Sequence, residues 1–398
     1  MFQHIDYYAG DPILGLMDKF TADARPTKVN LGIGIYYDDA GQLPVLDCVK
    51  TAEQRIASPI SPRPYLPMAG LLGHRQGCQR LLFGQEAKVI QDNRVATIAT
   101  IGGSGALKVG AELIHRWFPH AKCYVSDPTW SNHIAIFEGC GIEVGSYPYY
   151  DPANHSIRFE EMIGFIETLN KHDVLILHPC CHNPTGMDLT HEQWDQVLQV
   201  VQQRELIAFM DIAYQGFGED MDNDAYAIRK AAQMGLALFV SNSFSKNLSL
   251  YGERVGGLSI LCPDADQAER VFGQMNYIVR RIYTSPPSHG GHVVDLVMND
   301  AALYEQWVKE VYVMRDRIRS MRSELRARLE ASLPNHDFSY LTTQKGMFSF
   351  TGLATEQLER LQSEFGLYMV MNSRVCMAGL NSANIDYVAE AMATVLKG

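Results

Sequence analysis

Short apolar runs recur along the middle of the chain, and each is followed by glycines or polar residues and then by a stretch with helical spacing. Runs of this length are typical of buried strands, and their alternation with helices predicts an α/β fold with a mostly parallel sheet. We expect strands at residues 95–101, 123–125, 174–177, 206–210 and 236–240. Ligands of such sheets bind beyond the carboxyl ends of the strands, so the residues that follow each run are candidates for a functional site.

A different pattern marks the C-terminal part of the chain. Apolar residues recur at helical spacing between positions 314 and 329 and predict one long helix around residues 300–333, which Pro334 ends. The apolar positions are Met314, Ile318, Met321, Leu325 and Leu329. Arginines on the other faces of this helix are interpreted as solvent-exposed charges. They are Arg315, Arg319, Arg322 and Arg326.

Short strands are expected near residues 348–350 and 367–370, with a last helix near 387–396. These elements indicate a smaller α+β domain that follows the parallel sheet. A length of 398 residues suits two domains, because single domains usually have ~100–200 residues. We therefore expect a large domain at residues 46–310 and a small domain at 311–398. Residues 1–45 are expected to form an N-terminal arm and part of the small domain.

Composition narrows the possible partners. The formal net charge of −11 argues against a general nucleic-acid binder. No apolar run approaches the ~20 residues that a membrane-spanning helix needs, so no membrane role is expected. Eight cysteines occur without a CxxC pair, and the N-terminus lacks the pattern of a signal peptide. We expect reduced thiols and a cytoplasmic protein.

The polar residues after the last apolar run predict the chemistry. Ser243, Ser245 and Lys246 follow the strand expected at 236–240, and Arg254 stands eight positions after the lysine among glycines. A lysine amine forms an imine with an aldehyde, while hydroxyl and guanidinium groups hold a phosphate. Pyridoxal 5'-phosphate (PLP) carries both an aldehyde and a phosphate. A lone lysine in such a loop is more often simply solvated, so the PLP interpretation depends on the rest of the chain.

Two further strand ends support a cofactor site. Asp211 follows a strongly apolar run, and a buried carboxylate needs a cationic partner. The pyridinium nitrogen of PLP is such a partner, and a carboxylate that keeps it protonated makes the ring an electron sink. An N-cap or an ordinary ion pair is the alternative for Asp211. Residues 102–106 are glycine-rich and open a helix expected at 107–117, where free N–H groups can bind a phosphate, although the turn matches no nucleotide-binding fingerprint.

Two groups of side chains have chemistry that suits the cofactor ring and the substrate. Trp130 can stack on a flat ring, while Asn183 and Tyr214 can donate hydrogen bonds to its phenolate oxygen. Arg374 stands in an apolar setting, and its planar guanidinium suits the α-carboxylate of an amino acid. Arg280 is expected to lie in a proline-stiffened loop, where it can meet a second carboxylate. Surface exposure is the alternative for Arg280 and Arg281, and one of the two is expected to be simply exposed.

Together these motifs resemble those of the class I aminotransferases. The similarity rests on Asp-Pro-Thr-Trp at 127–130, His-Asn-Pro-Thr-Gly at 182–186, Asp-Ile-Ala-Tyr at 211–214 and Ser-Phe-Ser-Lys-Asn at 243–247, with Arg254 and Arg374 in the family's order. Within that family the chain is most similar to the bacterial aromatic-amino-acid branch, which is close to the aspartate aminotransferases. The resemblance implies the PLP-dependent transferase fold type I, PLP as cofactor, ping-pong transfer between amino and 2-oxo acids, and a homodimer with shared active sites.

The resemblance also implies a role for each matched residue. Lys246 would bind the PLP aldehyde and move the proton between substrate and cofactor, with Asp211 and Tyr214 as further catalytic residues and His133 supporting Asp211. Cofactor contacts are implied for Gly103, Ser104, Trp130, Asn183, Asp211, Tyr214, Ser243, Ser245, Lys246, Arg254 and, from the neighbouring subunit, Tyr65. Substrate contacts are implied for Gly34, Trp130, Asn183, Arg374 and the neighbouring subunit's Arg280.

Substrate preference follows from a few positions. Arg280 implies acceptance of aspartate and glutamate, with 2-oxoglutarate as an amino-group acceptor. The aromatic branch is similar in four residues: Tyr37, Leu43, Ser104 and Ser285. Pro64 departs from the leucine common in that branch. We expect activity with phenylalanine, tyrosine and tryptophan as well as dicarboxylates; an aspartate aminotransferase with little aromatic activity is the alternative.

Two other functions share part of this pattern. A fold type I lyase or decarboxylase would also need Lys246 and Asp211. Arg280 and Arg374 together favour transamination, because two carboxylate anchors fix the Cα–H bond perpendicular to the ring. An aminotransferase-like sensor of a transcription regulator usually has an added DNA-binding segment, for which we expect no room in this chain.

Overall fold

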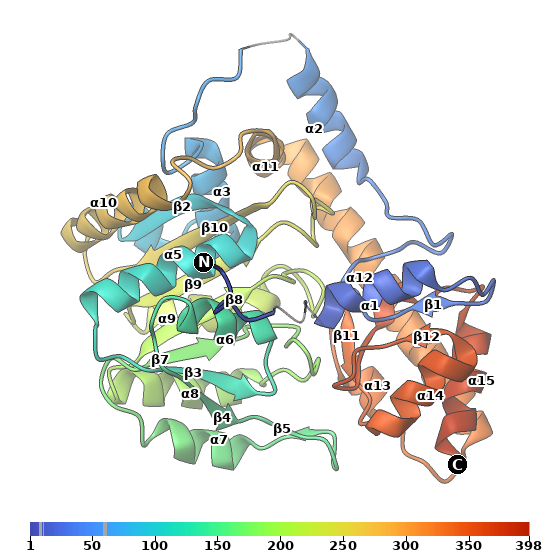
Figure 1. Cartoon of the computed structure of the whole chain (residues 1–398). Helices are drawn as coiled ribbons and strands as arrows, with labels where there is room; N and C mark the ends of the chain where they lie inside the picture. The colour runs from blue at the N-terminus through green and yellow to red at the C-terminus, as the bar shows by residue number, and fades with distance from the viewer. Residues whose placement is uncertain (8–9, 11, 59–61, 398) are drawn as a thin grey trace. The chain divides into compact units, whose positions relative to one another are not determined.

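The computed structural model describes residues 1–7, 10, 12–58 and 62–397 (Figure 1). The chain forms two compact units. One unit comprises Pro44–Asp316, and the other comprises Met1–Leu43 together with Arg317–Gly398. Helix α12 (Ala301–Ser332) passes from the first unit into the second.

A seven-stranded sheet organises the Pro44–Asp316 unit. In spatial order its strands are β2 (Val95–Ile101), β10 (Val255–Leu261), β9 (Leu238–Ser243), β8 (Ile207–Ile212), β7 (Val174–Leu177), β3 (Cys123–Asp127) and β4 (Val144–Pro148). Strand β10 is antiparallel to both of its neighbours, and the other pairs are parallel. The expected α/β fold with a mostly parallel sheet is therefore confirmed.

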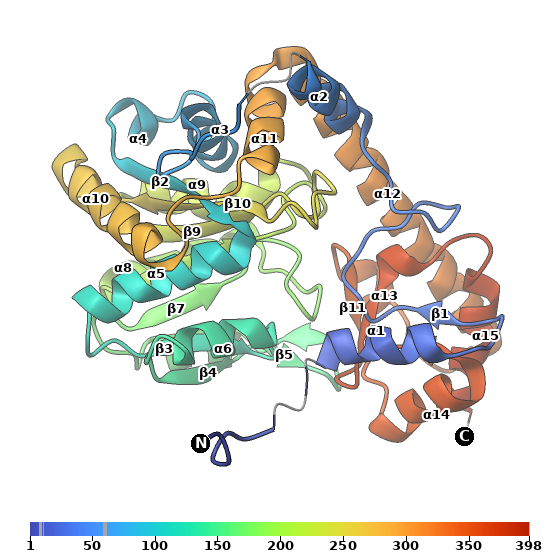
Figure 2. The same cartoon turned by 45° about the horizontal axis from the view of Figure 1, so that its top comes forward.

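Helices cover both faces of this sheet (Figures 1 and 2). Helices α5 (Gly102–Trp117), α6 (Ser131–Glu138) and α10 (Ala265–Ile282) lie on one face, and α3 (Leu72–Phe83), α8 (His191–Gln203) and α9 (Tyr226–Gln233) on the other. Apolar strand residues such as Ile98, Phe209 and Leu258 are buried beneath α5. A Cβ at Gly110 of α5 would lie 2.5 Å from the ring of Phe209, so the glycine lets the helix approach the sheet closely.

Shorter elements complete the Pro44–Asp316 unit. They are α2 (Asp47–Ala57), α4 (Lys88–Gln91), the hairpin β5 (Tyr150–Asp151) and β6 (Ser156–Ile157), α7 (Phe159–Ile166), η1 (Asn223–Ala225) and α11 (His289–Asn299). The helix predicted at 107–117 begins five residues earlier than expected, at Gly102. The glycine-rich turn is thus the first turn of α5 itself. The predicted start was too late because the glycines were interpreted as a separate loop before the helix.

The second unit contains two small sheets. Strand β1 (Val29–Asn30) pairs in parallel with β12 (Leu367–Tyr368), and β11 (Phe348–Phe350) pairs antiparallel with β13 (Arg374–Cys376). Its other elements are α1 (Pro12–Ala22), α13 (Tyr340–Thr343), α14 (Thr355–Phe365), η2 (Met377–Gly379) and α15 (Ile385–Leu396). The β1–β12 pairing joins the N-terminal segment to the C-terminal third of the chain within one unit.

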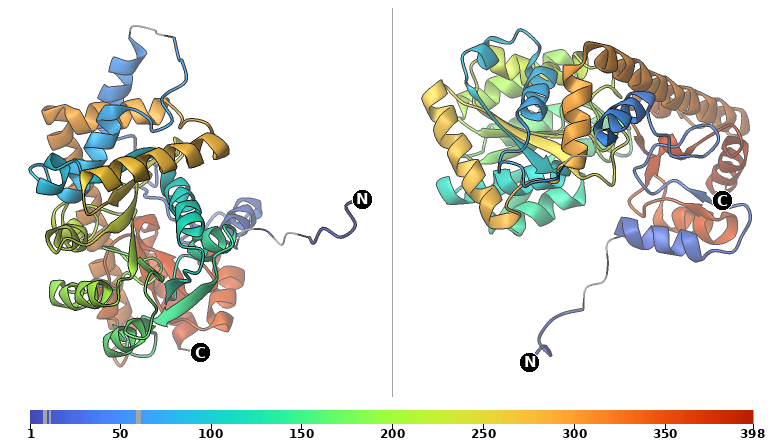
Figure 3. Two further views of the ribbon diagram at one scale, coloured as in Figure 1. Left: turned by 90° about the vertical axis from the view of Figure 1, so that its left-hand side faces the viewer. Right: turned by 90° about the horizontal axis from the view of Figure 1, so that it is seen from above.

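Helix α12 is the long helix predicted around residues 300–333, and it ends at Ser332, two residues before Pro334 (Figure 3, right). All five predicted apolar positions, from Met314 to Leu329, are buried. The interpretation of Arg322 as a solvent-exposed charge is wrong, because only 2% of the residue is exposed. Its guanidinium donates hydrogen bonds to the carbonyls of Leu341 and Gly346, at 2.9 and 2.8 Å. Helical spacing identifies the main apolar face but does not show that a second segment packs beside it.

Within the described residues, no helix combines the length and the apolar character required to cross a membrane.

Candidate active site

The carboxyl ends of β2, β3, β7, β8 and β9 lie at one edge of the large sheet, because these strands are mutually parallel apart from the intervening β10. Strand β10 runs the other way and therefore begins at that edge. Val255 pairs with Ile101, and Gly256 pairs with Ser243. The register thus brings Arg254, which precedes β10, next to the ends of β2 and β9. Residues that are far apart in sequence meet here, as strand-end reasoning predicted.

A cradle for an anion forms where β2 enters α5. Gly102 has a positive φ of 68°, and a Cβ there would lie 2.7 Å from Nη2 of Arg254. A Cβ at Gly103 would lie 3.6 Å from the Cβ of Ser243. The hydroxyl of Ser243 donates to Oγ of Ser245 at 3.1 Å and accepts from the Ser245 backbone N–H at 3.2 Å. The first turn of α5, a guanidinium and two hydroxyls are the groups that bind a phosphate.

A buried carboxylate lies beside this cradle. Oδ2 of Asp211, on β8, is 3.0 Å from Nε2 of His133. Burial raises the pKa of Asp211, but the hydrogen bond and charge of His133, with a smaller contribution from His178, outweigh burial and hold it below its ordinary value. Asp211 is therefore ionised at neutral pH.

The second oxygen of Asp211, Oδ1, is buried, and no donor among the described residues forms a hydrogen bond to it. The nearby hydroxyl of Ser241 donates instead to the Gly103 carbonyl at 3.3 Å. A buried carboxylate oxygen without a donor is costly, so the site favours a ligand that brings a cationic N–H.

Behind Asp211 lies a row of buried histidines. Nδ1 of His133 is 3.0 Å from the hydroxyl of Thr129, which is 3.4 Å from Nε2 of His178. The rings of His178 and His182 are 4.2 Å apart. Burial lowers the pKa of His178 to about 3, with the charge of His133 adding to the effect and that of Asp211 opposing it. His178 is thus neutral at neutral pH, and it contacts the Asp211–His133 pair through the hydroxyl of Thr129.

The resemblance identified His133 but assigned no role to Thr129 or His178. Two signals in the sequence were available. Thr129 stands four positions before His133, and His178 directly follows β7. Neither signal distinguishes a supporting residue from an ordinary buried one.

Lys246 follows β9 and Tyr214 follows the neighbouring strand β8, so both lie at the same edge of the sheet. The Nζ of Lys246 is 5.5 Å from the centre of the Tyr214 ring. The two segments are joined by Asn247, whose side chain donates to the carbonyl of Gln215 at 3.3 Å. The structure therefore brings the predicted catalytic lysine and tyrosine together.

Asn183 and Trp130 flank the histidine row. Asn183 is buried, and its backbone N–H donates to Nδ1 of His178 at 3.4 Å. The ring of Trp130, just before α6, contacts His133 edge-on with 5.3 Å between ring centres. Both predicted ring contacts thus lie beside the residues that support Asp211.

PLP fits these residues. A phosphate matches the cradle formed by the start of α5, the two serines and Arg254. A protonated ring nitrogen matches the unpartnered Oδ1 of Asp211. The amine of Lys246 matches the aldehyde. The matching groups lie at the ends of β2, β8 and β9 and at the start of β10, so the fit does not depend on a single motif.

Two predicted site residues are exposed in the single chain. Tyr65 has 90% of its surface exposed. Arg280 is also exposed, but it lies in the last turn of α10, so its expected place in a loop is wrong. Tyr65 lines a surface pocket of about 490 Å³ together with Pro64 and Ser285. Neither Tyr65 nor Arg280 is buried with the group around Asp211.

Two predicted substrate contacts lie in the second unit and are brought together there. Arg374 is only 4% exposed, and its Nη2 donates to the carbonyl of Gly32 at 2.7 Å. Its guanidinium is 4.2 Å from the ring centre of Phe348. A Cβ at Gly34 would lie 2.8 Å from the same ring. Phe348 thus holds Arg374 and the Gly34 backbone in one local arrangement, a role that the sequence did not predict.

The family model for aminotransferase class I and II matches residues 26–392, a range that contains every residue of the candidate site. The chain belongs to this aminotransferase family.

Individual relatives agree with this assignment. The aminotransferase chain is 54% identical to the aromatic-amino-acid aminotransferase of Escherichia coli K12, over the full length of both proteins. It is similar to the structure of a psychrophilic aromatic amino acids aminotransferase from Psychrobacter sp. B6 cocrystallised with aspartic acid, with 76% identity, a TM-score of 0.99 and complete coverage of both chains. It is also similar to an aromatic-amino-acid aminotransferase from Burkholderia pseudomallei covalently bound to pyridoxal phosphate, with 46% identity, a TM-score of 0.98 and coverage of 100% and 99%.

Proposed function

We propose that this aminotransferase uses PLP to transfer the amino group of phenylalanine, tyrosine, tryptophan, aspartate or glutamate to 2-oxoglutarate or another 2-oxo acid. The observation that carries the cofactor assignment is the buried, unpartnered Oδ1 of Asp211 at the same sheet edge as Lys246. The aromatic relatives and the aspartate in the Psychrobacter structure support the two substrate classes.

When bound, PLP supplies a ring that withdraws electrons from the bonds at the substrate's α-carbon. Asp211, supported by His133, would accept the N–H of the ring nitrogen and keep that nitrogen protonated. The Lys246 amine would be the base that takes the proton from the substrate's α-carbon.

The other residues orient the reacting groups. Arg374 binds the α-carboxylate through its planar fork, and the Gly34 backbone lies beside it. Tyr214 and Asn183 would donate hydrogen bonds to the ring oxygen, while Trp130 would cover the ring face and exclude water. The cradle of Gly103, Ser104, Ser243, Ser245 and Arg254 would hold the phosphate. Fixed orientation of this kind lowers the entropy cost of the reaction.

We propose that the working form is a homodimer in which each site receives Tyr65 and Arg280 from the neighbouring subunit. Large apolar side chains are exposed near these residues in sequence, which supports a partner surface. The exposed fractions are 59% for Leu72, 50% for Tyr277 and 43% for Ile282. We place the protein in the cytoplasm, because none of the cysteines in the described residues forms a disulfide and a reducing compartment keeps thiols in that state.

A mixture of two inactive variants is expected to regain aspartate transamination. In a mixed dimer of Lys246→Ala and Arg280→Ala chains, one site takes Lys246 from one chain and Arg280 from the other, and is therefore intact. The measurement is the aspartate rate after the two variants are unfolded and refolded together. Each variant refolded alone is the control. Failure of the mixture to exceed both controls would show that Arg280 serves its own chain.

Arg280→Ala is expected to lower kcat/KM for aspartate by about 10²–10³-fold, because the side-chain carboxylate loses a charge-assisted partner. The loss for phenylalanine should stay below about 10-fold, since its ring needs no cation. Steady-state rates with both substrates and 2-oxoglutarate check this. The matched control is Arg281→Ala, which removes the adjacent exposed arginine. Equal losses for both substrates would refute the shared pocket, and a wild type without phenylalanine activity would identify an aspartate aminotransferase.

A further inference from the structure

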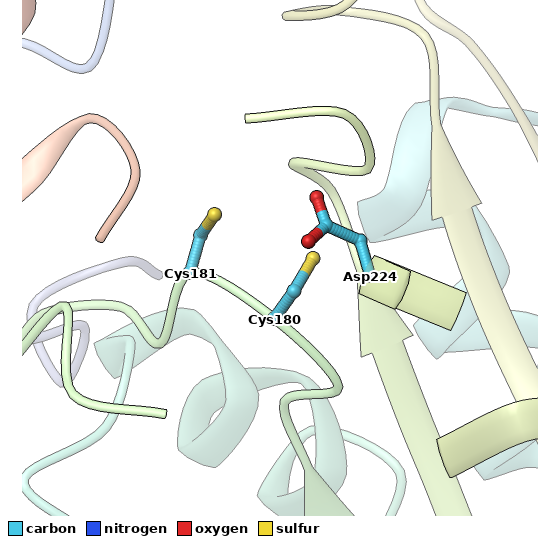
Figure 4. Close-up of side chains that lie close together, drawn as sticks. All are labelled: Cys180, Cys181 and Asp224. Carbon is cyan, nitrogen blue, oxygen red and sulfur yellow. The ribbon is translucent and has the colours of Figure 1, made fainter. Parts of the chain in front are cut away.

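Three buried side chains that could serve as metal ligands lie close together near the segment that follows β8. They are Cys180, Cys181 and Asp224, and their sulfur and carboxylate atoms lie within 4.8 Å of one another (Figure 4). The two cysteines follow β7, whereas Asp224 lies in η1, and Figure 4 shows both thiols beside the carboxylate. None of these residues belongs to the predicted site.

The chemistry of this cluster does not favour a metal. Burial raises the pKa of Cys180 well above its ordinary value, so its thiol is neutral and a poor ligand. The carboxylate of Asp224 is already engaged by the protein's own backbone. Oδ2 accepts the N–H groups of Gly216 and Gly218 at 2.8 and 2.9 Å, and Oδ1 accepts that of Glu219 at 2.7 Å.

The three donors belong to the segment directly after Tyr214. The Phe217 N–H closes a turn by donating to the Tyr214 carbonyl at 3.0 Å. A Cβ at Gly218 would lie 2.5 Å from Oδ1 of Asp224, so the close approach of the carboxylate depends on this glycine. One side chain therefore fixes the backbone on which the ring of Tyr214 depends.

Holding a charge here is unfavourable for folding. Burial raises the pKa of Asp224 to about 6 although the three N–H groups act in the opposite direction. A carboxyl group whose pKa is raised in the folded state stabilises the fold fully below the ordinary value of 3.8, and that stabilisation is lost as the pH rises through about 6. At neutral pH the ionised Asp224 thus lowers the free energy of unfolding. We therefore look for the role of Asp224 in the backbone geometry that its carboxylate imposes and not in stability.

We propose that Asp224 is a positioning residue for the cofactor contact made by Tyr214. Its carboxylate fixes the backbone of residues 216–219 and thereby the direction in which Tyr214 presents its hydroxyl to the ring oxygen of PLP. The inference rests on the proposed role of Tyr214.

Further contacts hold this segment and join it to the lysine. The thiol of Cys181 donates to the carbonyl of Tyr214 at 3.9 Å. Asn247, the residue after Lys246, donates to the carbonyl of Gln215. Its own carbonyl accepts the indole N–H of the buried Trp307 at 2.6 Å. A shift of the Tyr214 segment therefore changes its spacing from Lys246 as well.

Asp224→Asn tests the proposal with little change in shape. An amide has one acceptor oxygen in place of two, so it cannot accept all three N–H groups. Oriented toward Gly216 and Gly218, it places an NH₂ group against the Glu219 N–H. The segment should move, and its amide hydrogens should exchange faster in both the apo-protein and the PLP-loaded protein.

The decisive readout is the pH at which the visible absorbance of the PLP-loaded protein changes. A hydrogen bond from Tyr214 to the anionic ring oxygen favours the deprotonated form of the bound cofactor. We expect Asp224→Asn to raise the midpoint by about 0.5–1 pH unit, a roughly 3- to 10-fold change in proton affinity. Tyr214→Phe should raise the midpoint further than Asp224→Asn does. The double variant should have the same midpoint as Tyr214→Phe alone.

The matched control is Asp173→Asn. Asp173 is also buried and accepts two backbone N–H groups, from Lys122 and Asn170, at the start of β7. This variant should lower thermal stability without moving the absorbance midpoint. A purely structural Asp224 would behave in the same way, and that result would overturn the proposal, as would a full shift that persists in the Tyr214→Phe background.

A second variant covers the case in which Asp224→Asn does not fold. In Gly218→Ala the added methyl group would lie too close to the carboxylate of Asp224 and so displace the same backbone segment. This variant should therefore also raise the absorbance midpoint. An unchanged midpoint in folded Gly218→Ala protein would also count against the proposal. Failure of the proposed function is distinguishable, since wild-type protein would then show no visible absorbance with PLP at all.

Discussion

Lys246→Ala is expected to lower kcat/KM for aspartate and phenylalanine alike by about 10⁴-fold or more, because one change removes both the covalent anchor and the proton carrier. The purified variant should also lack the visible absorbance that a lysine-bound cofactor gives. Steady-state assays and an absorbance spectrum after incubation with PLP measure the two effects separately.

A suitable control for the Lys246 variant is Lys230→Ala. Lys230 lies on α9, where its amine pairs with Asp195 at 2.9 Å. Its removal should leave both rate and spectrum close to those of the wild type, since a partly exposed ion pair contributes little. Retention of turnover and colour in the Lys246 variant would contradict the proposed function.

Asp211→Asn is expected to lower kcat by about 10³-fold for every substrate, because an amide cannot keep the ring nitrogen protonated and the electron sink weakens. The measurement is the single-turnover rate of proton transfer with aspartate and with phenylalanine. A cofactor analogue whose ring nitrogen carries a permanent methyl group should restore part of the rate. Its charge no longer depends on the residue at position 211.

Asp173→Asn is again the control for the Asp211 variant, because it makes the same substitution at a buried carboxylate that accepts only backbone N–H groups. It should retain near wild-type single-turnover rates. A loss confined to one substrate class in the Asp211 variant would show that Asp211 binds substrate instead of the cofactor ring.

Apolar runs were a reliable guide to the sheet. All five predicted strands are present, but β4 and β10 were not predicted. Strand β10 has glycines at its second and third positions, 256 and 257, and glycine has low strand propensity. The structure explains both, since a Cβ at Gly256 would lie 2.5 Å from the carbonyl of Asn242 and one at Gly257 would lie 2.8 Å from the side-chain oxygen of Asn242. The packing that requires glycine there is a contact between strands and leaves no local signal.

The positions of the strand ends also predicted the main residues of the candidate site. Asp211, Lys246 and Arg254 each stand beside a strand, and parallel strands end at one edge. Thr129, His178 and Asp224 support these residues through contacts across the fold. Asp224 lies in a strongly acidic stretch, residues 219–224, whose composition indicates an exposed loop. Only the three-dimensional contacts reveal that its carboxylate is buried against backbone N–H groups.

The buried histidine row behind Asp211 has a consequence for behaviour in acid. The pKa of His178 is near 3 in the folded protein instead of the ordinary 6.5. Just below pH 6.5 the histidine is therefore protonated in the unfolded chain but neutral in the folded one. Acidification below about pH 6.5 therefore reduces what this histidine contributes to the free energy of unfolding. The cost of keeping an uncharged imidazole under the catalytic carboxylate thus grows in mild acid, opposite in sign to the effect of Asp224.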